Sequence, residues 1–281
     1  MQACAYAKRR RQLGDTKDMK KFAFMAIFLL LFSTFSACST QEQTQGETRL
    51  TVFAAASLSA ALSEVAALYT ANHPETNIVF NFDSSGTLRT QIMQGADADV
   101  FFSAATHEMI QLQEAGFILD NTPVDILENQ VVLVTAGDAV GDITSFSDMI
   151  AVLMAGDVLM AMGNMDVPIG RYAQEILQYF GLDHETLAQT AVITYASNVR
   201  AVATQVREGS VDFGIVYLTD AADFGLYVVD IATAEMTGRV IYPAAVISGS
   251  QNADAAKSFL SFLMDDAAMN IFRTWGFLSP R

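Results

Sequence analysis

Four segments of this chain share one pattern: an apolar run typical of a strand, a short turn of small or polar residues, and a run with helical spacing. The clearest lies within residues 81–102, where the turn at 83–86 (Asp-Ser-Ser-Gly) precedes a helix predicted from Thr87 to Gly95. Such a turn brings unpaired backbone N–H groups, hydroxyls and the positive end of the helix dipole to one point. That point can hold an anion without a charged side chain. The simpler interpretation is that Ser84 or Ser85 only caps the helix.

The other three turns lie at residues 55–58, 163–172 and 196–200. Pro168 suits the first position of the helix that follows the second of these turns, and Ser197 or Asn198 is a candidate cap for the helix after the third. The recurrence favours a shared binding role over four unrelated helix caps.

Strands and helices alternate along most of the chain. Strands are predicted at residues 49–54, 77–82, 99–104, 130–135, 158–162, 192–195, 212–217, 227–230 and 240–247. Helices are predicted at residues 59–71, 107–115, 147–154, 169–180, 198–208 and, for the most part, 253–275. This order predicts an α/β fold in which helices cover a parallel sheet on both faces. Ligands bind outside the carboxyl ends of the strands in such sheets, which is where the turns lie.

Residues 1–38 have the layout of an export signal. Two lysines, Lys20 and Lys21, precede an apolar run at 22–32 that is too short for a good membrane span, and small residues lead to Cys38. This end resembles a bacterial lipobox, in which the cysteine is lipidated, although Phe35 stands where leucine is usual. Ordinary cleavage nearby is the alternative. Met19 is a candidate start codon, and the polar stretch 39–47 is predicted to be a flexible tether.

Composition limits the partners. The chain of 281 residues has a formal net charge of -15, and removal of residues 1–37 takes away seven of the 16 Lys and Arg and two of the 31 Asp and Glu. The remaining 9 basic and 29 acidic side chains give -20. We therefore expect no nucleic acid partner. Of the two cysteines only Cys38 is retained, so no internal disulfide is expected in the mature chain.

Catalytic and metal-binding interpretations have little support in the sequence. The histidines, His73, His107 and His184, show no metal-ligand spacing. Ser57 and Ser85 lack the G-x-S-x-G pattern of a nucleophile elbow. We expect no cofactor and no enzymatic activity, with a secreted α/β serine hydrolase as the alternative from another class.

Six blocks together resemble the molybdate-binding periplasmic protein of bacterial ABC importers. They are FAAASL at 53–58, DSSGTLRTQIMQGADADVFFSA at 83–104, GNMDVPIGRYAQEIL at 163–177, SNVRAV at 197–202, GIVYLTDA at 214–221 and YPAAV at 242–246. The resemblance covers essentially all of residues 49–281. It implies a two-lobe periplasmic-binding-protein fold of type II, with one lobe at 48–129 plus 242–281 and the other at 130–241. Hinges are expected near Asn129 and Tyr242, with closure of the lobes on the ligand.

The resemblance also implies how the ligand is held. Matching the motifs assigns the molybdate or tungstate donors to the hydroxyl and N–H groups of Ser57 and Ser85, the backbone N–H groups of Ile169 and Val199, and the phenol of Tyr217. The expected partner is an inner-membrane ABC permease, and the receptor is expected to be a monomer, exported and anchored only through lipid.

Two positions depart from the family pattern. Ile169 stands where alanine is usual, and Asp83 stands where a neutral residue is usual, so Asp83 is expected to point outward or to cap its turn. Arg200 either lends positive charge to the cleft or lies on a solvated helix face. A receptor for another tetrahedral oxyanion, such as sulfate, is the alternative within the same class.

Overall fold

The computed structural model describes residues 47–137, 143–182, 187 and 191–280. The predicted signal segment, Cys38, all but the last residue of the predicted tether, and His184 lie outside these residues.

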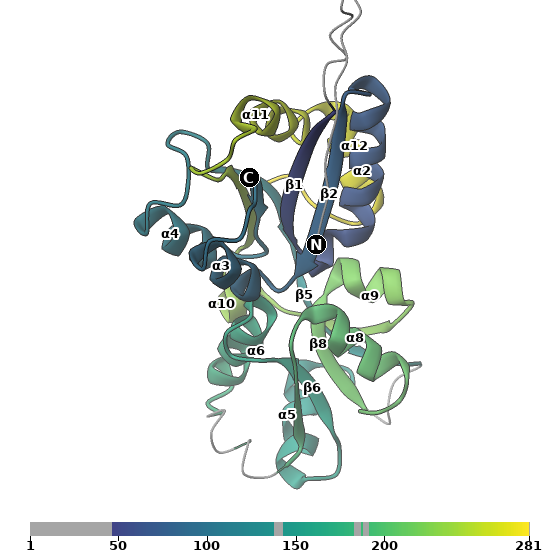
Figure 1. Cartoon of the computed structure of the whole chain (residues 1–281). Coiled ribbons are helices and arrows are strands. Elements are labelled where there is room, and N and C mark those ends of the chain that lie inside the picture. Colours follow the sequence, from purple (N-terminus) through teal and green to yellow (C-terminus); the bar gives the residue numbers. More distant parts are fainter. Residues whose placement is uncertain (1–46, 138–142, 183–186, 188–190, 281) are drawn as a thin grey trace, which may run out of the picture. The chain divides into compact units, whose positions relative to one another are not determined.

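The first sheet has five strands in the order β2-β1-β3-β10-β4. The strands are β1 (Thr48–Ala55), β2 (Thr76–Asp83), β3 (Val100–Phe102), β4 (Val124–Asn129) and β10 (Val240–Val246). The helices that pack with them are the short 3-10 helix η1 (Ala56–Leu58), α2 (Ser59–Asn72), α3 (Ser85–Met93), α4 (Thr106–Glu114), α11 (Ala253–Phe262) and α12 (Asp266–Thr274). We call this part lobe 1 (Figure 1).

The second sheet has five strands in the order β7-β6-β8-β5-β9. The strands are β5 (Val131–Thr135), β6 (Met160–Gly163), β7 (Ile193–Ala196), β8 (Phe213–Tyr217) and β9 (Tyr227–Ile231). Its helices are α5 (Phe146–Ala155), α6 (Pro168–Tyr179), α8 (Val199–Arg207), α9 (Leu218–Phe224) and α10 (Ala234–Thr237). We call this part lobe 2 (Figure 1).

The two sheets follow the same plan of strand directions. In lobe 1, β2, β1 and β3 pair in parallel, whereas β10 is antiparallel to both β3 and β4. In lobe 2, β7, β6 and β8 are parallel, whereas β5 is antiparallel to both β8 and β9. Each sheet therefore has one reversed strand, second from an edge. The predicted α/β class is confirmed, with mixed rather than purely parallel sheets.

Helices cover both faces of the first sheet because its strands are apolar on both sides. Leu50, Val52 and Ala54 of β1 belong to the core under α2, α11 and α12. Phe53, between them, belongs to a second cluster with residues of α3 and α4. Successive side chains of a strand point to opposite faces, so this continuous apolar run fills two cores at once.

The chain passes between the sheets at two places. β4 ends at Asn129 and β5 begins at Val131, and the return to the first sheet is complete at Val240, two residues before Tyr242. That these crossings act as hinges stays a prediction.

Three sequence expectations need correction. Helix α3 begins at Ser85 rather than Thr87, because Ser84 is the N-cap and accepts a hydrogen bond from the Thr87 N–H. The helix predicted at 253–275 is two helices, and the second begins after Asp265, where acidic residues suit a helix start. Strand β4 was missed because Asp125 and Glu128 interrupt its apolar pattern.

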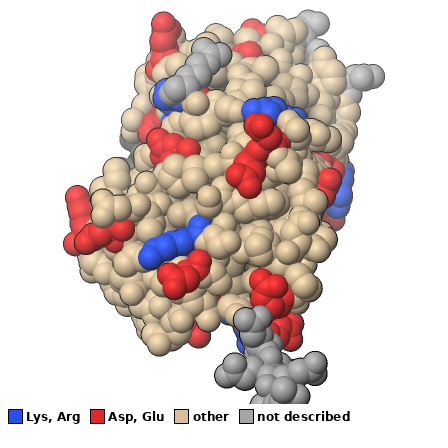
Figure 2. All heavy atoms as spheres, turned by 90° about the horizontal axis from the view of Figure 1, so that it is seen from above, with Lys and Arg blue, Asp and Glu red and all other residues tan. Residues whose placement is uncertain are grey.

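Within the described ranges, none of the helices combines the length and hydrophobicity that a bilayer-spanning helix requires. On the face shown in Figure 2, acidic side chains are scattered over the surface and basic side chains lie beside them, without a basic patch.

Candidate functional site

One pocket lies where the four predicted turns meet. It holds about 230 Å³ of space free of protein atoms, part of it open to solvent. All five donors predicted from the sequence line it, together with seven further neutral residues. The complete lining is Ala55, Ala56, Ser57, Ser84, Ser85, Ala104, Val167, Pro168, Ile169, Asn198, Val199 and Tyr217. None of these side chains carries a charge.

The first residues of three helices line this pocket. Ser85 opens α3, Ile169 is the second residue of α6, and Val199 opens α8. The first N–H groups of a helix have no carbonyl one turn back to bind, and the helix dipole adds positive potential there. Three such ends make the pocket electropositive without any lysine or arginine in its lining.

The Ser85 side chain lines this pocket and accepts one hydrogen bond from the protein. Its oxygen accepts a hydrogen bond of 2.9 Å from the backbone N–H of Ala104, at the carboxyl end of β3. That bond uses one lone pair of the oxygen and leaves the hydroxyl hydrogen unused, so the hydrogen can be donated to a ligand. Sequence reasoning missed Ala104, although its place after a parallel strand, at the same edge as the turns, was a usable signal.

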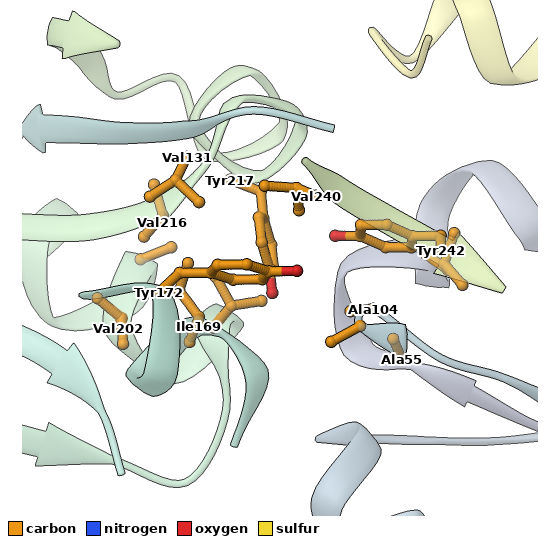
Figure 3. Packing of buried hydrophobic residues seen from close by; sticks show 14 of the residues in the cluster. Ala55, Ala104, Val131, Ile169, Tyr172, Val202, Val216, Tyr217, Val240 and Tyr242 are labelled. Carbon is orange, nitrogen blue, oxygen red and sulfur yellow. The ribbon is translucent and has the colours of Figure 1, made fainter. Parts of the chain in front are cut away.

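Tyr217 lines the pocket, and its hydroxyl makes no hydrogen bond in the described part of the chain. The side chain is 1% exposed, and its oxygen is buried without a hydrogen-bond partner in the described part of the chain. Burial, followed by neighbouring tyrosines and acidic groups, raises the pKa of this phenol, so it stays protonated and can donate. Figure 3 shows the hydroxyls of Tyr172, Tyr217 and Tyr242 pointing toward a common space. A buried, unpaired donor is costly unless a ligand satisfies it.

The comparisons with known proteins agree with this geometry. Residues 50–278 match the family model described as bacterial extracellular solute-binding protein. The chain belongs to this family.

Individual relatives share most of its length. The Escherichia coli molybdate-binding protein ModA is 34% identical over 236 residues, which cover 82% of this chain and 89% of ModA. YvgL of Bacillus subtilis, named as an ABC transporter substrate-binding lipoprotein, is 34% identical over 263 residues, or 92% of this chain and 98% of YvgL. The solved periplasmic molybdate-binding protein of Azotobacter vinelandii matches with a TM-score of 0.71 at 23% identity, covering 83% of this chain and all of that one. The family resemblance and the two-lobe fold are thereby confirmed.

In this solute-binding protein the two lobes touch beside the pocket. A Cβ atom added at Gly86 of lobe 1 would lie 2.1 Å from the Asp166 carbonyl oxygen of lobe 2. The Asn198 side-chain amide of lobe 2 donates to the Asp83 carboxylate at 3.4 Å, and Arg171 of lobe 2 pairs with Glu108 of lobe 1. Such contacts require closely apposed lobes, so the structure is a closed form of the receptor.

The structure decides between the alternatives given for Asp83 and for Arg200. Asp83 caps its turn, as expected, because its carboxylate accepts a hydrogen bond of 2.7 Å from the Ser84 N–H. Arg200 does not line the pocket; it pairs with Asp223 at 2.7 Å and lies over the Phe224 ring. The solvated-face interpretation of Arg200 is therefore the better one.

The two histidines that the structure describes lie apart from the site. His73 stacks on Tyr69, with ring centroids 4.2 Å apart, and His107 is exposed at the start of α4. Among the described residues no group of three or more His, Cys, Asp or Glu side chains could hold a metal ion.

Asp220 near the base of the site makes stability depend on pH. This carboxyl, in the first turn of α9, is 1% exposed, and neither oxygen has a hydrogen-bond partner in the described part of the chain. Burial raises its pKa to about 7, against an opposing effect of Arg200 and a smaller reinforcing one of Asp223. The unfolded chain thus loses this proton near pH 4 and the folded chain near pH 7, so stability falls between those values and is not regained above them.

We expect Asp220→Asn to remove this loss. The variant should be more stable than the parent by up to ~4 kcal/mol at pH 8, with a much smaller difference at pH 4, because each pKa unit is worth about 1.36 kcal/mol. Chemical denaturation at both pH values checks this, with the exposed Asp97→Asn as the matched control. An Asp220→Asn stability gain of equal size at pH 4 and pH 8 would show that the buried charge is not its cause.

Proposed function

We propose that this solute-binding protein captures molybdate or tungstate in the pocket between its lobes and delivers the ion to an ABC permease. The observation that carries the proposal is the convergence of three helix N-termini and the unpaired Tyr217 hydroxyl on one uncharged pocket. Hydrogen bonds to a charged acceptor contribute about 1.5 to 3 kcal/mol each. The five predicted donors therefore supply energy on the scale of micromolar binding, about -8 kcal/mol.

The choice of ion is supported by the names of the relatives and by the kind of lining. ModA of Escherichia coli is named for molybdate. A pocket whose donors face inward favours a fully deprotonated tetrahedral anion, because the O–H of a protonated anion would compete with the lining hydrogens for the same positions. Sulfate satisfies the same criterion and differs mainly in size, so it remains the alternative ion.

The proposal includes the cellular context of the receptor. Export, with the chain acting outside the cytoplasm, accords with the extracellular family and with the signal layout at residues 1–38. We propose in addition that the receptor is a monomer. Lipidation at Cys38 accords with the naming of YvgL as a lipoprotein. Metabolic labelling with a radioactive fatty acid should mark the parent chain and not Cys38→Ser.

A hydrolytic function is the weaker alternative. The pocket around Ser57 and Ser85 is lined, in the described residues, by no histidine, carboxylate or lysine that could act as general base. We therefore propose a binding protein without catalysis.

Calorimetric titration of the purified chain with molybdate, tungstate and sulfate tests the function. We expect molybdate and tungstate to bind with micromolar or tighter Kd and to displace sulfate. Tight sulfate binding that molybdate does not compete away would transfer the assignment to sulfate, and no binding of any of the three would refute the proposal.

The backbone donor at Val199 can be tested by itself. Val199 is the first residue of α8, and Asn198 before it has ψ 172°, a conformation that tolerates a following proline. Val199→Pro should remove the N–H while preserving the helix start, and should weaken molybdate binding about tenfold, the equivalent of one charged hydrogen bond. Val199→Ala keeps the N–H and is the matched control. Equal Kd values for the proline and alanine variants would exclude this N–H as a ligand donor.

A further inference from the structure

The closed structure contains a chain of hydrogen bonds that reaches the pocket from behind. It links Thr219 of α9, Asn129 at the end of β4, Tyr242 of β10 and Ser57 of η1. All four side chains are buried. Of these four, only Ser57 lines the pocket, so the hydrogen bonds connect the other three to a ligand through Ser57.

The direction of this chain is fixed at Asn129. The side-chain oxygen of Asn129 accepts the Gln130 N–H at 2.8 Å, which orients the amide. Its nitrogen then donates one hydrogen to the Thr219 hydroxyl oxygen at 2.9 Å and the other to the Tyr242 hydroxyl oxygen at 3.2 Å. Both amide hydrogens are used, and Tyr242 is an acceptor from Asn129.

The direction continues through Tyr242 to Ser57. The Tyr242 oxygen lies 3.0 Å from the Ser57 hydroxyl oxygen. Because Tyr242 already accepts from Asn129, its single hydrogen is available for Ser57. The side chain is fully buried, and this burial raises the pKa of the phenol, which keeps that hydrogen in place. Either hydroxyl could donate across this contact. Donation from Tyr242 to Ser57 is the arrangement that gives the buried Tyr242 hydrogen an acceptor, and it leaves the Ser57 hydrogen to face the pocket.

We infer that Asn129 and Tyr242 are positioning residues that make Ser57 a hydrogen-bond donor to the ligand, and that this relay sets the selectivity for fully deprotonated oxyanions. The inference rests on the proposed function. Ser57 would then resemble Ser85, whose hydroxyl oxygen accepts a hydrogen bond from the Ala104 N–H. In both serines a protein donor binds the oxygen and the hydrogen is left for the ligand. With one lone pair of each serine oxygen engaged and each serine hydrogen turned to the pocket, a protonated anion such as hydrogen phosphate meets donors where its own O–H needs an acceptor.

The relay also connects the lobes. Thr219 belongs to lobe 2, whereas Asn129, Tyr242 and Ser57 belong to lobe 1 and lie at or near the predicted hinges. The orientation of Asn129 is therefore supported from both lobes in the closed form. An open form that separates Thr219 from Asn129 would loosen the Ser57 hydroxyl.

The test compares anions that differ in protonation. The purified parent chain, Tyr242→Phe and the control Tyr69→Phe are titrated at pH 6 with molybdate, sulfate and phosphate, which carries hydrogens at that pH. Tyr69 is equally buried and also donates its phenol hydrogen to a serine, Ser258 at 3.0 Å, but lies away from the pocket. We expect Tyr242→Phe to weaken molybdate binding about threefold to tenfold, on the scale of one neutral hydrogen bond. Tyr242→Phe should also reduce the preference for molybdate over phosphate. Tyr69→Phe should change neither the molybdate affinity nor this preference.

The Ser57→Ala variant shows whether Tyr242 affects binding by positioning Ser57 or by its own packing. If Tyr242 acts through Ser57, adding Tyr242→Phe to Ser57→Ala should cost little further affinity. Asn129→Ala removes the donor to Tyr242, so the Tyr242 hydroxyl could turn and accept from Ser57. It should therefore also reduce the ratio of molybdate affinity to phosphate affinity. This variant replaces Tyr242→Phe if the latter folds poorly. Equal weakening of all anions, or additive effects in the double variant, would overturn the relay. Failure of the parent chain to bind any oxyanion would instead refute the proposed function.

Discussion

Gly86→Ala should abolish tight oxyanion binding while leaving lobe 1 folded. The added methyl would lie 2.1 Å from the Asp166 carbonyl oxygen and 3.3 Å from its carbonyl carbon, both in the backbone of the opposite lobe. No side chain can rotate away to relieve this contact, so the lobes must stay apart. The donors of lobe 2 then fall short of a ligand held by lobe 1, and we expect molybdate affinity to fall at least about 100-fold, or about 2.8 kcal/mol.

The folded state of lobe 1 should not suffer, because Gly86 lies in α3 and alanine favours a helix by up to about 1 kcal/mol over glycine. Gly249→Ala is the matched control, since a Cβ there meets nothing within 4 Å. Titration measures the affinity, and small-angle scattering with and without molybdate measures closure. A Gly86→Ala chain that binds and compacts like the parent would show that the lobes do not close as the structure has them.

Tyr217→Phe should move binding and stability in opposite directions. The Tyr217 hydroxyl is buried without a partner in the described residues, and removing it should leave the ligand-free protein equally stable or more stable by ~1 kcal/mol. The same change deletes a donor to a charged ligand, so we expect molybdate affinity to fall about 10-fold to 100-fold. Thermal unfolding and calorimetry of one preparation measure both quantities.

His107→Ala, at an exposed position outside the pocket, serves as the binding control and should retain parental affinity. A Tyr217→Phe chain that loses stability without losing affinity would mean that the phenol supports the fold rather than the ligand.

The sequence was sufficient to predict the features that depend on local pattern. The turns before α3, α6 and α8 were visible as strand-to-helix junctions, and parallel topology brings the carboxyl ends of strands to one edge. The grouping of Ser57, Ser85 and Val199 in one pocket accords with that topology. The individual donor roles came from the family resemblance and stay predictions.

Features that depend on contacts between distant segments could not be predicted. Glu108 is 0% exposed, yet its helix gave no sign that Arg171, 63 residues away, would pair with it across the lobes. The bonds of Asn129 to Thr219 and Tyr242 likewise join residues 90 and 113 positions apart. Such pairings follow from the packed fold and leave no periodic trace in the chain.

In the proposed function, neutral dipoles hold a doubly charged anion inside a strongly acidic protein. The pocket lining carries no charge, and the whole chain has a formal net charge of -15. The long-range field therefore opposes the ligand, and the attraction is confined to the hydrogen-bonding distance of the helix N-termini and hydroxyls. Added salt screens the long-range repulsion and leaves the buried contacts almost unchanged.

The Kd for molybdate as a function of ionic strength tests this claim most directly. Calorimetric titrations at constant pH between about 0.01 and 0.15 M salt span Debye lengths from about 30 to 8 Å. We expect a Kd that stays constant or decreases as salt rises. A Kd that increases steadily with salt would mean that a lysine or arginine attracts the anion, and would contradict binding by neutral dipoles.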